Sequence, residues 1–214
     1  MMLPSAIILD AFGTVIEIKH RTNPYKMLLR EGARQGRIPT GDDLHTLMTT
    51  NCTIAQAADV LSIRISASRR EVIQEALDEE LDSLEPFSDA LEAIEMLSDA
   101  GIRIGVCSNL AAPFGAGLKQ CFHRVDAFTL SYEIGVMKPH SLIYEVMCAS
   151  LGVQPGRDWL QGASSVLMIG DSPKCDRDGP RAVGISGFLL DRTKGSAIPD
   201  LVHFANMVLA GQQS

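Results

Sequence analysis

Four polar residues of this 214-residue sequence stand where they could act together on a substrate. Asp10, Ser108 and Asp171 each end a short apolar run, and Lys138 stands just before Pro139. A carboxylate can attack an electrophilic phosphorus or carbon atom and divide one difficult displacement into two easier steps. A lysine beside it would reduce the repulsion between the negative nucleophile and an anionic substrate. These residue types therefore indicate covalent catalysis by a carboxylate, provided that the fold brings them together.

The apolar runs before these residues predict strands of a parallel sheet. The runs cover residues 6–9, 102–107 and 166–169. They are too short for helices and are almost entirely apolar, as strands buried on both faces are. Apolar residues at helical spacing over 90–97 and 142–151 alternate with them, which predicts βαβ units. In such a sheet, ligands bind outside the carboxyl ends of the strands. We therefore expect Asp10, Ser108 and Asp171 to share one edge, with Lys138 opening the helix that follows it.

The stretch from about residue 23 to 84 differs, because it has several helical patterns and no convincing buried strand. Asn23-Pro24 is typical of a helix start, and Ser66 or Ser68 could cap a later helix. The sequence therefore predicts an α/β protein with a parallel sheet and an inserted, all-helical subdomain.

Four segments, in this order, resemble the motifs of the haloacid dehalogenase-like hydrolase superfamily. They are IILDAFGTV at 7–15, VCSN at 106–109, EIGVMKP at 133–139, and MIGDSPKCD at 168–176 followed by Gly179 and Gly184. The resemblance covers nearly the whole chain except the helical insert. It implies a Rossmann-like three-layer core formed by residues 1–18 and 86–214, with the first type of helical cap over 19–85.

The resemblance also implies roles for individual residues. The catalytic residues would be the nucleophile Asp10 together with Ser108 and Lys138. Substrate would contact Phe12, Gly13, Thr14 and Asn109. A Mg²⁺ ion would be held by the carboxylates of Asp10, Asp171 and Asp176 and by the backbone carbonyl of Phe12, since hard cations prefer oxygen ligands.

Phe12 departs from the phosphatase pattern, which has a second aspartate there as general acid. Phenylalanine transfers no proton, and such an acid is worth roughly 10²–10⁴-fold in rate. An aromatic residue here, together with Tyr144, is similar to the haloacid dehalogenases, in which halide leaves unprotonated and no metal is used. Asp171 argues for a metal instead, because two further carboxylates beside Asp10 would otherwise crowd negative charge. We favour a Mg²⁺-dependent phosphatase-type enzyme acting on a small phosphorylated metabolite. The alternatives are a metal-independent 2-haloacid dehalogenase and a catalytically weak member that binds a metabolite or a protein.

Three arginines at the start of the insert offer a substrate contact, since one of them could clamp a carboxylate or a remote phosphate. For at least two of Arg21, Arg30 and Arg34 we expect the commoner position on a solvated helix face.

The composition of the chain limits which kinds of partner we expect it to bind. A net charge of −7 gives no reason to expect nucleic acid or an anionic membrane surface, although an anionic small-molecule substrate remains compatible with it. Five cysteines without paired spacing argue against a disulfide framework and a zinc site. No apolar run approaches the roughly 20 residues of a membrane span. These features predict a cytoplasmic protein, and they leave its oligomeric state open.

Overall fold

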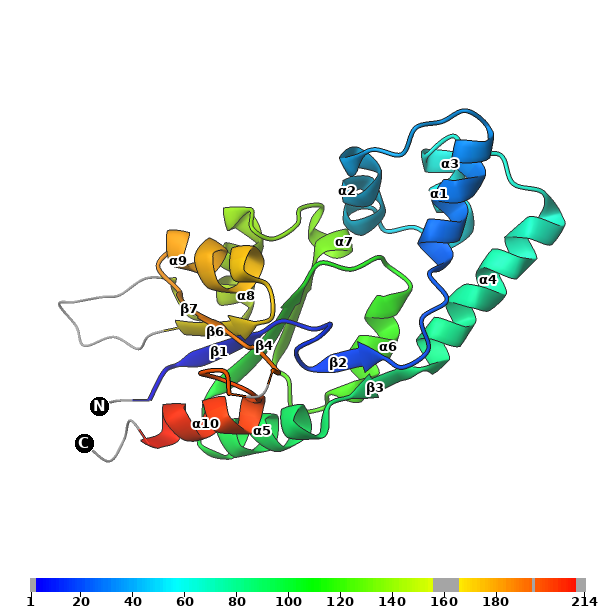
Figure 1. Cartoon of the computed structure of the whole chain (residues 1–214). Helices are drawn as coiled ribbons and strands as arrows, with labels where there is room; N and C mark the ends of the chain where they lie inside the picture. The colour runs from blue at the N-terminus through cyan, green and yellow to red at the C-terminus, as the bar shows by residue number, and fades with distance from the viewer. Residues whose placement is uncertain (1–2, 156–165, 194, 211–214) are drawn as a thin grey trace.

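The computed structural model describes residues 3–155, 166–193 and 195–210. They form a parallel sheet with helices on both faces, and four further helices project beyond one edge of that sheet (Figure 1). The sheet strands are β1 (Ala6–Leu9), β4 (Arg103–Ser108), β5 (Ala127–Leu130), β6 (Val166–Gly170) and β7 (Ser186–Leu189). This is the α/β architecture with a Rossmann-like core that the sequence predicts.

The strand order is β5-β4-β1-β6-β7, and every neighbouring pair is parallel. The central strand β1 lies between β4 and β6, with Ala6 opposite both Arg103 and Val166. The chain therefore proceeds outward from β1 in two directions, and β1 marks the point where the strand order reverses. Such a point creates a crevice at the carboxyl edge of the sheet, where ligands bind in open α/β proteins.

Alternation along β1 divides the core between the two faces of the sheet. Ile7 and Leu9 belong to one buried cluster, and Ala6 and Ile8 belong to the other. The first face is covered by α5 (Ser88–Asp99), α6 (Phe114–Cys121) and α10 (Leu201–Ala210), and the second by α8 (Ser141–Ser150). Each fully buried aliphatic side chain stabilises the fold by roughly 1.5–3 kcal/mol.

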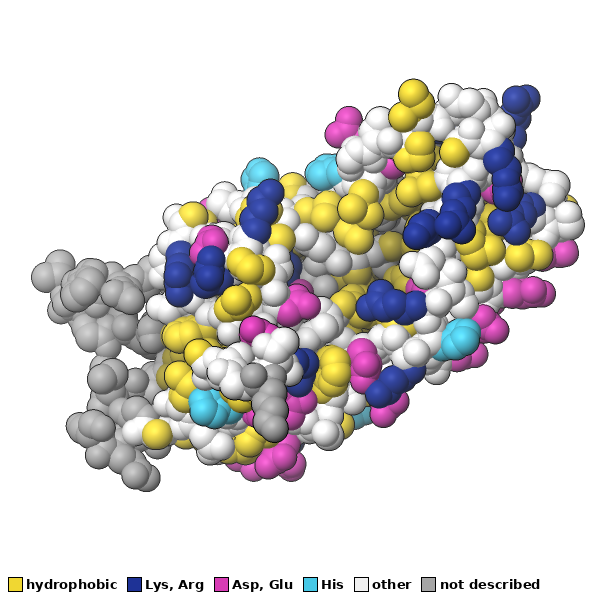
Figure 2. Space-filling view, in the orientation of Figure 1, with side chains coloured by type: hydrophobic (Ala, Val, Ile, Leu, Met, Phe, Trp, Pro, Cys, Tyr) yellow, Lys and Arg dark blue, Asp and Glu magenta, His cyan; other side chains and the backbone are white. Residues whose placement is uncertain are grey.

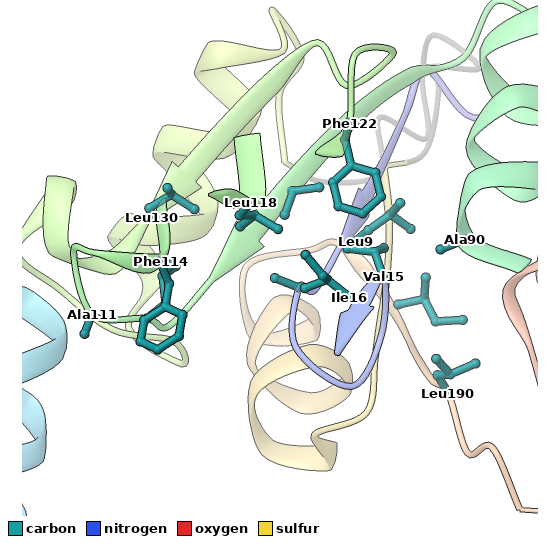
Figure 3. Close-up of a cluster of buried hydrophobic side chains, with 14 of the residues drawn as sticks. Leu9, Val15, Ile16, Ala90, Ala111, Phe114, Leu118, Phe122, Leu130 and Leu190 are labelled. Atoms are coloured by element: carbon teal, nitrogen blue, oxygen red, sulfur yellow. The ribbon is translucent and has the colours of Figure 1, made fainter. Parts of the chain in front are cut away.

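Part of the first cluster lies close to the carboxyl end of β1 (Figure 3). Leu9 and Val15 lie there near Phe122 at the end of α6, and Ile16 and Phe114 belong to the same cluster. The loop that follows β1 is therefore anchored by its own apolar side chains, which fixes the place of Asp10.

The helical insertion is joined to the sheet by an antiparallel pair of short strands. These are β2 (Ile16–Ile18) and β3 (Leu84–Pro86), with Ile16 opposite Pro86. Between them lie α1 (Pro24–Arg34), α2 (Gly41–Thr49), α3 (Ile54–Val60) and α4 (Ala67–Asp82). Strand β2 ends at residue 18 and β3 ends at residue 86. The expected division of the chain at these residues stays a prediction. The remaining short elements are α7 (Ser131–Ile134), a π-helical turn η1 (Pro173–Asp178) and α9 (Gly179–Ala182).

The structure meets the expectations for the starts of α4 and α1, but not the expected place of Lys138. Ser66 caps α4, and its hydroxyl accepts a hydrogen bond from the Arg69 N–H at 3.2 Å. Helix α1 begins at Pro24, but Asn23 adopts a left-handed conformation (φ 60°) and its side chain forms no cap. Lys138 does not open the following helix, because α8 begins three residues later and is capped by His140.

Two further observations concern the described residues alone. No helix among them is both long and apolar enough to cross a membrane. All five cysteines are free thiols.

Candidate active site

The carboxyl edge of the sheet brings together the three polar residues that follow the predicted strands. Asp10 comes directly after β1, and its N–H donates to the Ile169 carbonyl at 3.0 Å, so that the ladder with β6 continues to this residue. Ser108 is the last residue of β4, and Asp171 follows β6. The three residues thus lie at one edge because their strands are parallel neighbours.

Lys138 is the centre of the polar contacts at this edge. Its Nζ donates to Asp10 Oδ1 at 2.6 Å, to Asp176 Oδ1 at 2.7 Å and to the Cys107 carbonyl at 2.8 Å. These are the three hydrogen bonds an ammonium group can donate. Burial acts to lower the pKa of Lys138, but Asp10 and Asp176 outweigh it and raise that pKa well above its usual value. Lys138, which is 4% exposed, is therefore a fixed buried cation.

The carboxylate of Asp10 lies in a strongly perturbed environment. Burial raises the pKa of Asp10 to about 6; Lys138 opposes this shift, while Asp176 and Asp171 add to it. Thr14 Oγ1 donates a long hydrogen bond of 3.4 Å to the Asp10 Oδ2 atom. One oxygen of Asp10 thus faces Lys138, and the other lies toward the loop that follows β1.

Two glycines let the backbone approach the carboxylates closely. Gly13 has a φ of +83°, and a Cβ atom there would collide with Asp171 Oδ2. A Cβ atom at Gly170 would collide with both Asp176 and Asp10. Any larger residue would therefore push apart the groups that form the site.

Arg192 fastens the loop after β1 from outside. It donates to the carbonyls of Gly13 (3.3 Å) and Thr14 (2.7 Å), and it forms an ion pair with Asp89 at 3.0 Å. Its guanidinium also lies 4.0 Å from the centre of the Phe87 ring. This residue could not be predicted from the sequence, because nothing near Arg192 indicates a contact with residues about 180 positions earlier.

Asn109 contacts the backbone of Lys138. Its Oδ1 accepts from the Lys138 N–H at 2.7 Å, and its Nδ2 donates to the Lys138 carbonyl at 3.0 Å. Together with the Cys107 carbonyl, these bonds place residues on both sides of Ser108 in contact with Lys138. The expected contacts of Ser108 and Asn109 with substrate stay predictions.

Tyr144 lies inside the second core cluster, where it is fully buried. Its hydroxyl donates to the Cys175 carbonyl at 2.6 Å, and the neighbouring Asp176 accepts a hydrogen bond from the Ser172 N–H at 2.9 Å on Oδ2. Both contacts fix the turn η1 and, through it, the second carboxylate beside Lys138.

Three carboxylates can converge on one cation at this edge. Ligand oxygens of Asp10, Asp171 and Asp176 all lie within 4.8 Å of one another. Asp171 is exposed and Asp176 is buried, so the cluster opens toward solvent on one side only. All of these ligand atoms are oxygens, and Lys138 offsets only part of their negative charge. Such a set suits a hard divalent cation. The residues present therefore fit Mg²⁺, and the part of the Phe12 carbonyl stays a prediction.

A cavity of about 340 Å³ adjoins this cluster between the insertion and the sheet. Phe12 and Asn109 belong to its lining and connect it to the polar centre. The Phe12 ring packs edge-on against Phe114, with 5.7 Å between the ring centres. Figure 2 shows the hollow between the two parts of the molecule, with hydrophobic side chains inside it and basic side chains near its rim.

The fold and this polar centre define a hydrolase class. The family model for haloacid dehalogenase-like hydrolases matches residues 4–184, and the chain belongs to this family.

Relatives of known structure share the fold across nearly the whole chain. A HAD phosphatase from Thermococcus onnurineus is similar with a TM-score of 0.64 and 17% identity, covering 97% of this chain and 98% of that one. An L-2-haloacid dehalogenase from Xanthobacter autotrophicus gives a TM-score of 0.61 and 17% identity, covering 97% and 99%. Since both phosphatases and dehalogenases match equally well, these likenesses show the fold alone.

One curated relative matches over a shorter stretch. The ribulose-1,5-bisphosphate 5-phosphatase of Halopiger xanaduensis is 28% identical over 119 residues, which are 54% of this chain and 46% of that protein. The match thus spans less than half of the relative.

Proposed function

We propose that this chain is a Mg²⁺-dependent, phosphatase-type hydrolase of a small phosphorylated metabolite, with Asp10 as the nucleophile. The observation that carries the proposal is the position of Asp171, whose carboxylate lies in one cluster with Asp10 and Asp176. Lys138 alone cannot balance three carboxylates, and a metal-free enzyme would gain nothing from a third. The curated relative supports the proposal because it is itself a phosphatase.

The residues of the chain have distinct tasks in this reaction. An oxygen of Asp10 attacks the phosphorus atom, the bond from phosphorus to the leaving-group oxygen breaks, and the leaving group departs with the electron pair. Water then cleaves the aspartyl phosphate, which releases inorganic phosphate and restores Asp10. Lys138 fixes one Asp10 oxygen at 2.6 Å, so that the other oxygen is presented to the substrate.

The proposal assigns positions to the remaining groups. Ser108, Asn109 and free backbone N–H groups of the loop after Asp10 would donate hydrogen bonds to phosphoryl oxygens. The N–H groups of Gly13 and Thr14 are already used, because they donate to the carbonyls of Ile16 (2.9 Å) and Ala11 (3.1 Å). A bound Mg²⁺ would supply positive charge against the phosphoryl group as charge develops on it. Residues 19–85 would serve as the cap that closes over the substrate, on a core formed by 1–18 and 86–214.

Phe12 sets the kind of leaving group. No proton donor stands at this position, so the substrate must release a stable anion, or alkyl esters will react slowly. The same residue favours the second candidate function, dehalogenation of a 2-haloacid, because halide leaves without a proton. Asp171 distinguishes the phosphatase from the dehalogenase, since it would bind the metal in the first reaction and has no function in the second.

The test is phosphate release from 4-nitrophenyl phosphate, measured with Mg²⁺ and with a chelator. We expect activity only with the metal, and its loss in Asp10→Asn and Asp171→Ala. Asp178→Asn is the matched control, because Asp178 lies in the same segment but is exposed and paired with Arg177. Mg²⁺ should also raise the melting temperature of the wild type and of Asp178→Asn, but not that of Asp171→Ala.

Two other outcomes would replace the proposal. Release of chloride from 2-chloropropionate that persists in chelator would establish the dehalogenase instead. Absence of both reactions, with a metabolite or protein still raising the melting temperature, would favour a binding protein.

A further inference from the structure

The cavity beside Phe12 combines apolar walls with two cations. Apolar side chains that line it come from both the core that contains the parallel sheet and the insertion. Among them are Phe12, Met48, Leu110 and Phe114. Arg21 and Lys26 line the same cavity from the start of the insertion. Its volume of about 340 Å³ lies at the small end of the range for ligand sites.

Neither cation has a carboxylate partner within the described part of the chain, whereas three other arginines of the insertion do. Arg34 and Arg69 both pair with Glu31, and Arg37 pairs with Asp43. The first turn of α1, which carries Lys26, contains no acidic residue. The positive charge at the cavity is therefore available to a ligand.

The only carboxylate among the described lining residues is engaged elsewhere. Glu80, which is buried, accepts on Oε1 from the N–H groups of Thr22 (2.9 Å) and Asn23 (2.6 Å). These bonds tie the segment between Arg21 and Lys26 to α4. Glu80 thus fixes the backbone that carries the two cations while its own oxygen is used by backbone donors.

The position of the cations fixes which part of a substrate they could meet. The transferred phosphoryl group belongs at Asp10 and Lys138, whose polar contacts lie at the sheet edge. Phe12 and Asn109 connect that edge to the cavity, so the leaving group must extend across Phe12 toward Arg21 and Lys26. A leaving group that is short, carbon-based and negatively charged at its far end would match these walls.

We propose that Arg21 and Lys26 form a subsite for a second anionic group, a carboxylate or a second phosphate, on the leaving group of the phosphorylated substrate. The inference rests on the proposed function for the placement of the transferred phosphate. It limits the substrate class to small metabolites with two separated anionic groups, and it makes phosphate esters with an uncharged leaving group poor substrates.

The test compares three aryl phosphates whose leaving groups depart without a proton donor. 4-Carboxyphenyl phosphate and benzene-1,4-diyl bisphosphate carry the second anion, and the carboxylic methyl ester of the first keeps only the phosphate charge. The phenols differ in acidity, so each variant is compared with wild type on the same probe; of the two probes with a second anion, the one whose kcat/KM falls more identifies the anion. Arg21→Gln and Lys26→Gln should each lose about fivefold on these two, the scale of a partly solvated charge-assisted bond. Both variants should leave the methyl ester unchanged.

Arg30→Gln is the matched control, because Arg30 is an exposed arginine of α1 outside the cavity lining. It should behave as wild type with every probe. Equal losses on the methyl ester and on the two probes with a second anion, or no loss on any probe, in the two variants would overturn the inference and leave the phosphatase proposal standing.

A binding measurement separates the inference from the chemistry. Isothermal titration of Asp10→Asn protein with 4-carboxyphenyl phosphate and with its methyl ester needs no turnover. The carboxylate should improve affinity about fivefold, and adding Arg21→Gln should remove that gain. If no gain is seen, the subsite is refuted even in an active phosphatase. If the gain is seen without any hydrolysis, the subsite stands and the proposed reaction fails.

Discussion

Asn109 and Lys138 are joined by two hydrogen bonds between one side-chain amide and one backbone residue. The Lys138 N–H donates to Asn109 Oδ1 at 2.7 Å, and Asn109 Nδ2 donates to the Lys138 carbonyl at 3.0 Å. The pair joins the end of β4 to the segment before α8, two parts of the chain that only the sheet brings together. Asn109 thus holds the backbone from which the ammonium group reaches Asp10, and we predict that it acts on the proposed reaction through Lys138.

Replacement of Asn109 tests this positioning role. Asn109→Ala removes both bonds and should lower kcat by about tenfold or more, because displaced catalytic groups lose rate steeply. Asn109→Asp keeps the acceptor for the Lys138 N–H and should recover part of the loss. Steady-state kinetics would check both variants. An Asn109→Ala enzyme with unchanged kcat and a raised KM would assign Asn109 to substrate binding alone.

Lys138 should be required for the stability of the site as well as for activity. Lys138→Met leaves Asp10 and Asp176 buried beside each other without their shared cation. Breaking a buried ion pair from one side costs about 3–5 kcal/mol, so the free energy of unfolding should fall by about that amount. Urea denaturation measures it, and Lys174→Met, an exposed lysine of the same region, should change it little. Equal stabilities of the two variants would contradict the buried cation seen here.

Arg192 should affect the rate of reaction more than the fold. Arg192→Gln removes a cation that binds the carbonyls of Gly13 and Thr14, so the loop that we expect to contact the phosphoryl group is no longer held. We expect kcat to fall by about tenfold, with a change in unfolding free energy below about 2 kcal/mol, as surface ion pairs contribute little. Arg124→Gln is the control, since Arg124 pairs with Asp99 on the surface. A melting temperature that falls as steeply as the activity would indicate a purely structural role.

Local sequence patterns were sufficient to predict those strands and helices that show a regular spacing of apolar residues. The apolar run 6–9 coincides with β1, and the helical spacings over 90–97 and 142–151 lie within or close to α5 and α8. The strand pair β2–β3 was not predicted, because each strand has three residues, too few to show an alternation. Its pairing also depends on a contact between residues almost 70 positions apart.

The candidate site likewise has a part that the sequence predicts and a part that it does not. Asp10, Lys138 and Asp176 could be selected from motif positions, and the structure joins them in one set of hydrogen bonds. The contacts that hold them could not be selected, since Asn109 and Arg192 act through backbone groups far away in the sequence. An amide used for positioning and an amide that binds substrate look alike in a sequence, and only the partner distinguishes them.

Asp43 provides a test of stability against pH away from the catalytic centre. The side chain of Arg37, hydrogen-bonded to both carboxylate oxygens, lowers the pKa of Asp43 to about 2. A carboxyl group with a lowered folded-state pKa stabilises the fold above its unfolded pKa, and loses this effect as pH falls through the folded pKa. Asp43→Asn should therefore cost about 1–2 kcal/mol near neutral pH, with the difference from wild type shrinking between about pH 4 and pH 2. Urea denaturation at several pH values measures this, and a difference independent of pH would contradict the assignment.

Phe12 allows the proposed chemistry to be changed in a predictable direction. Phe12→Asp places a carboxyl group where a phosphatase of this family has its general acid. Hydrolysis of an alkyl phosphate should then rise relative to that of 4-nitrophenyl phosphate, which needs no proton, by up to about 10²-fold. Phe12→Asn is the matched control, because it removes the same edge-on contact with Phe114 and introduces a polar group of similar size that is no acid. The ratio of the two kcat/KM values is the measurement, and it cancels any loss of folded protein. An equal rise in both variants would mean that space at residue 12, and not a proton donor, limits the reaction.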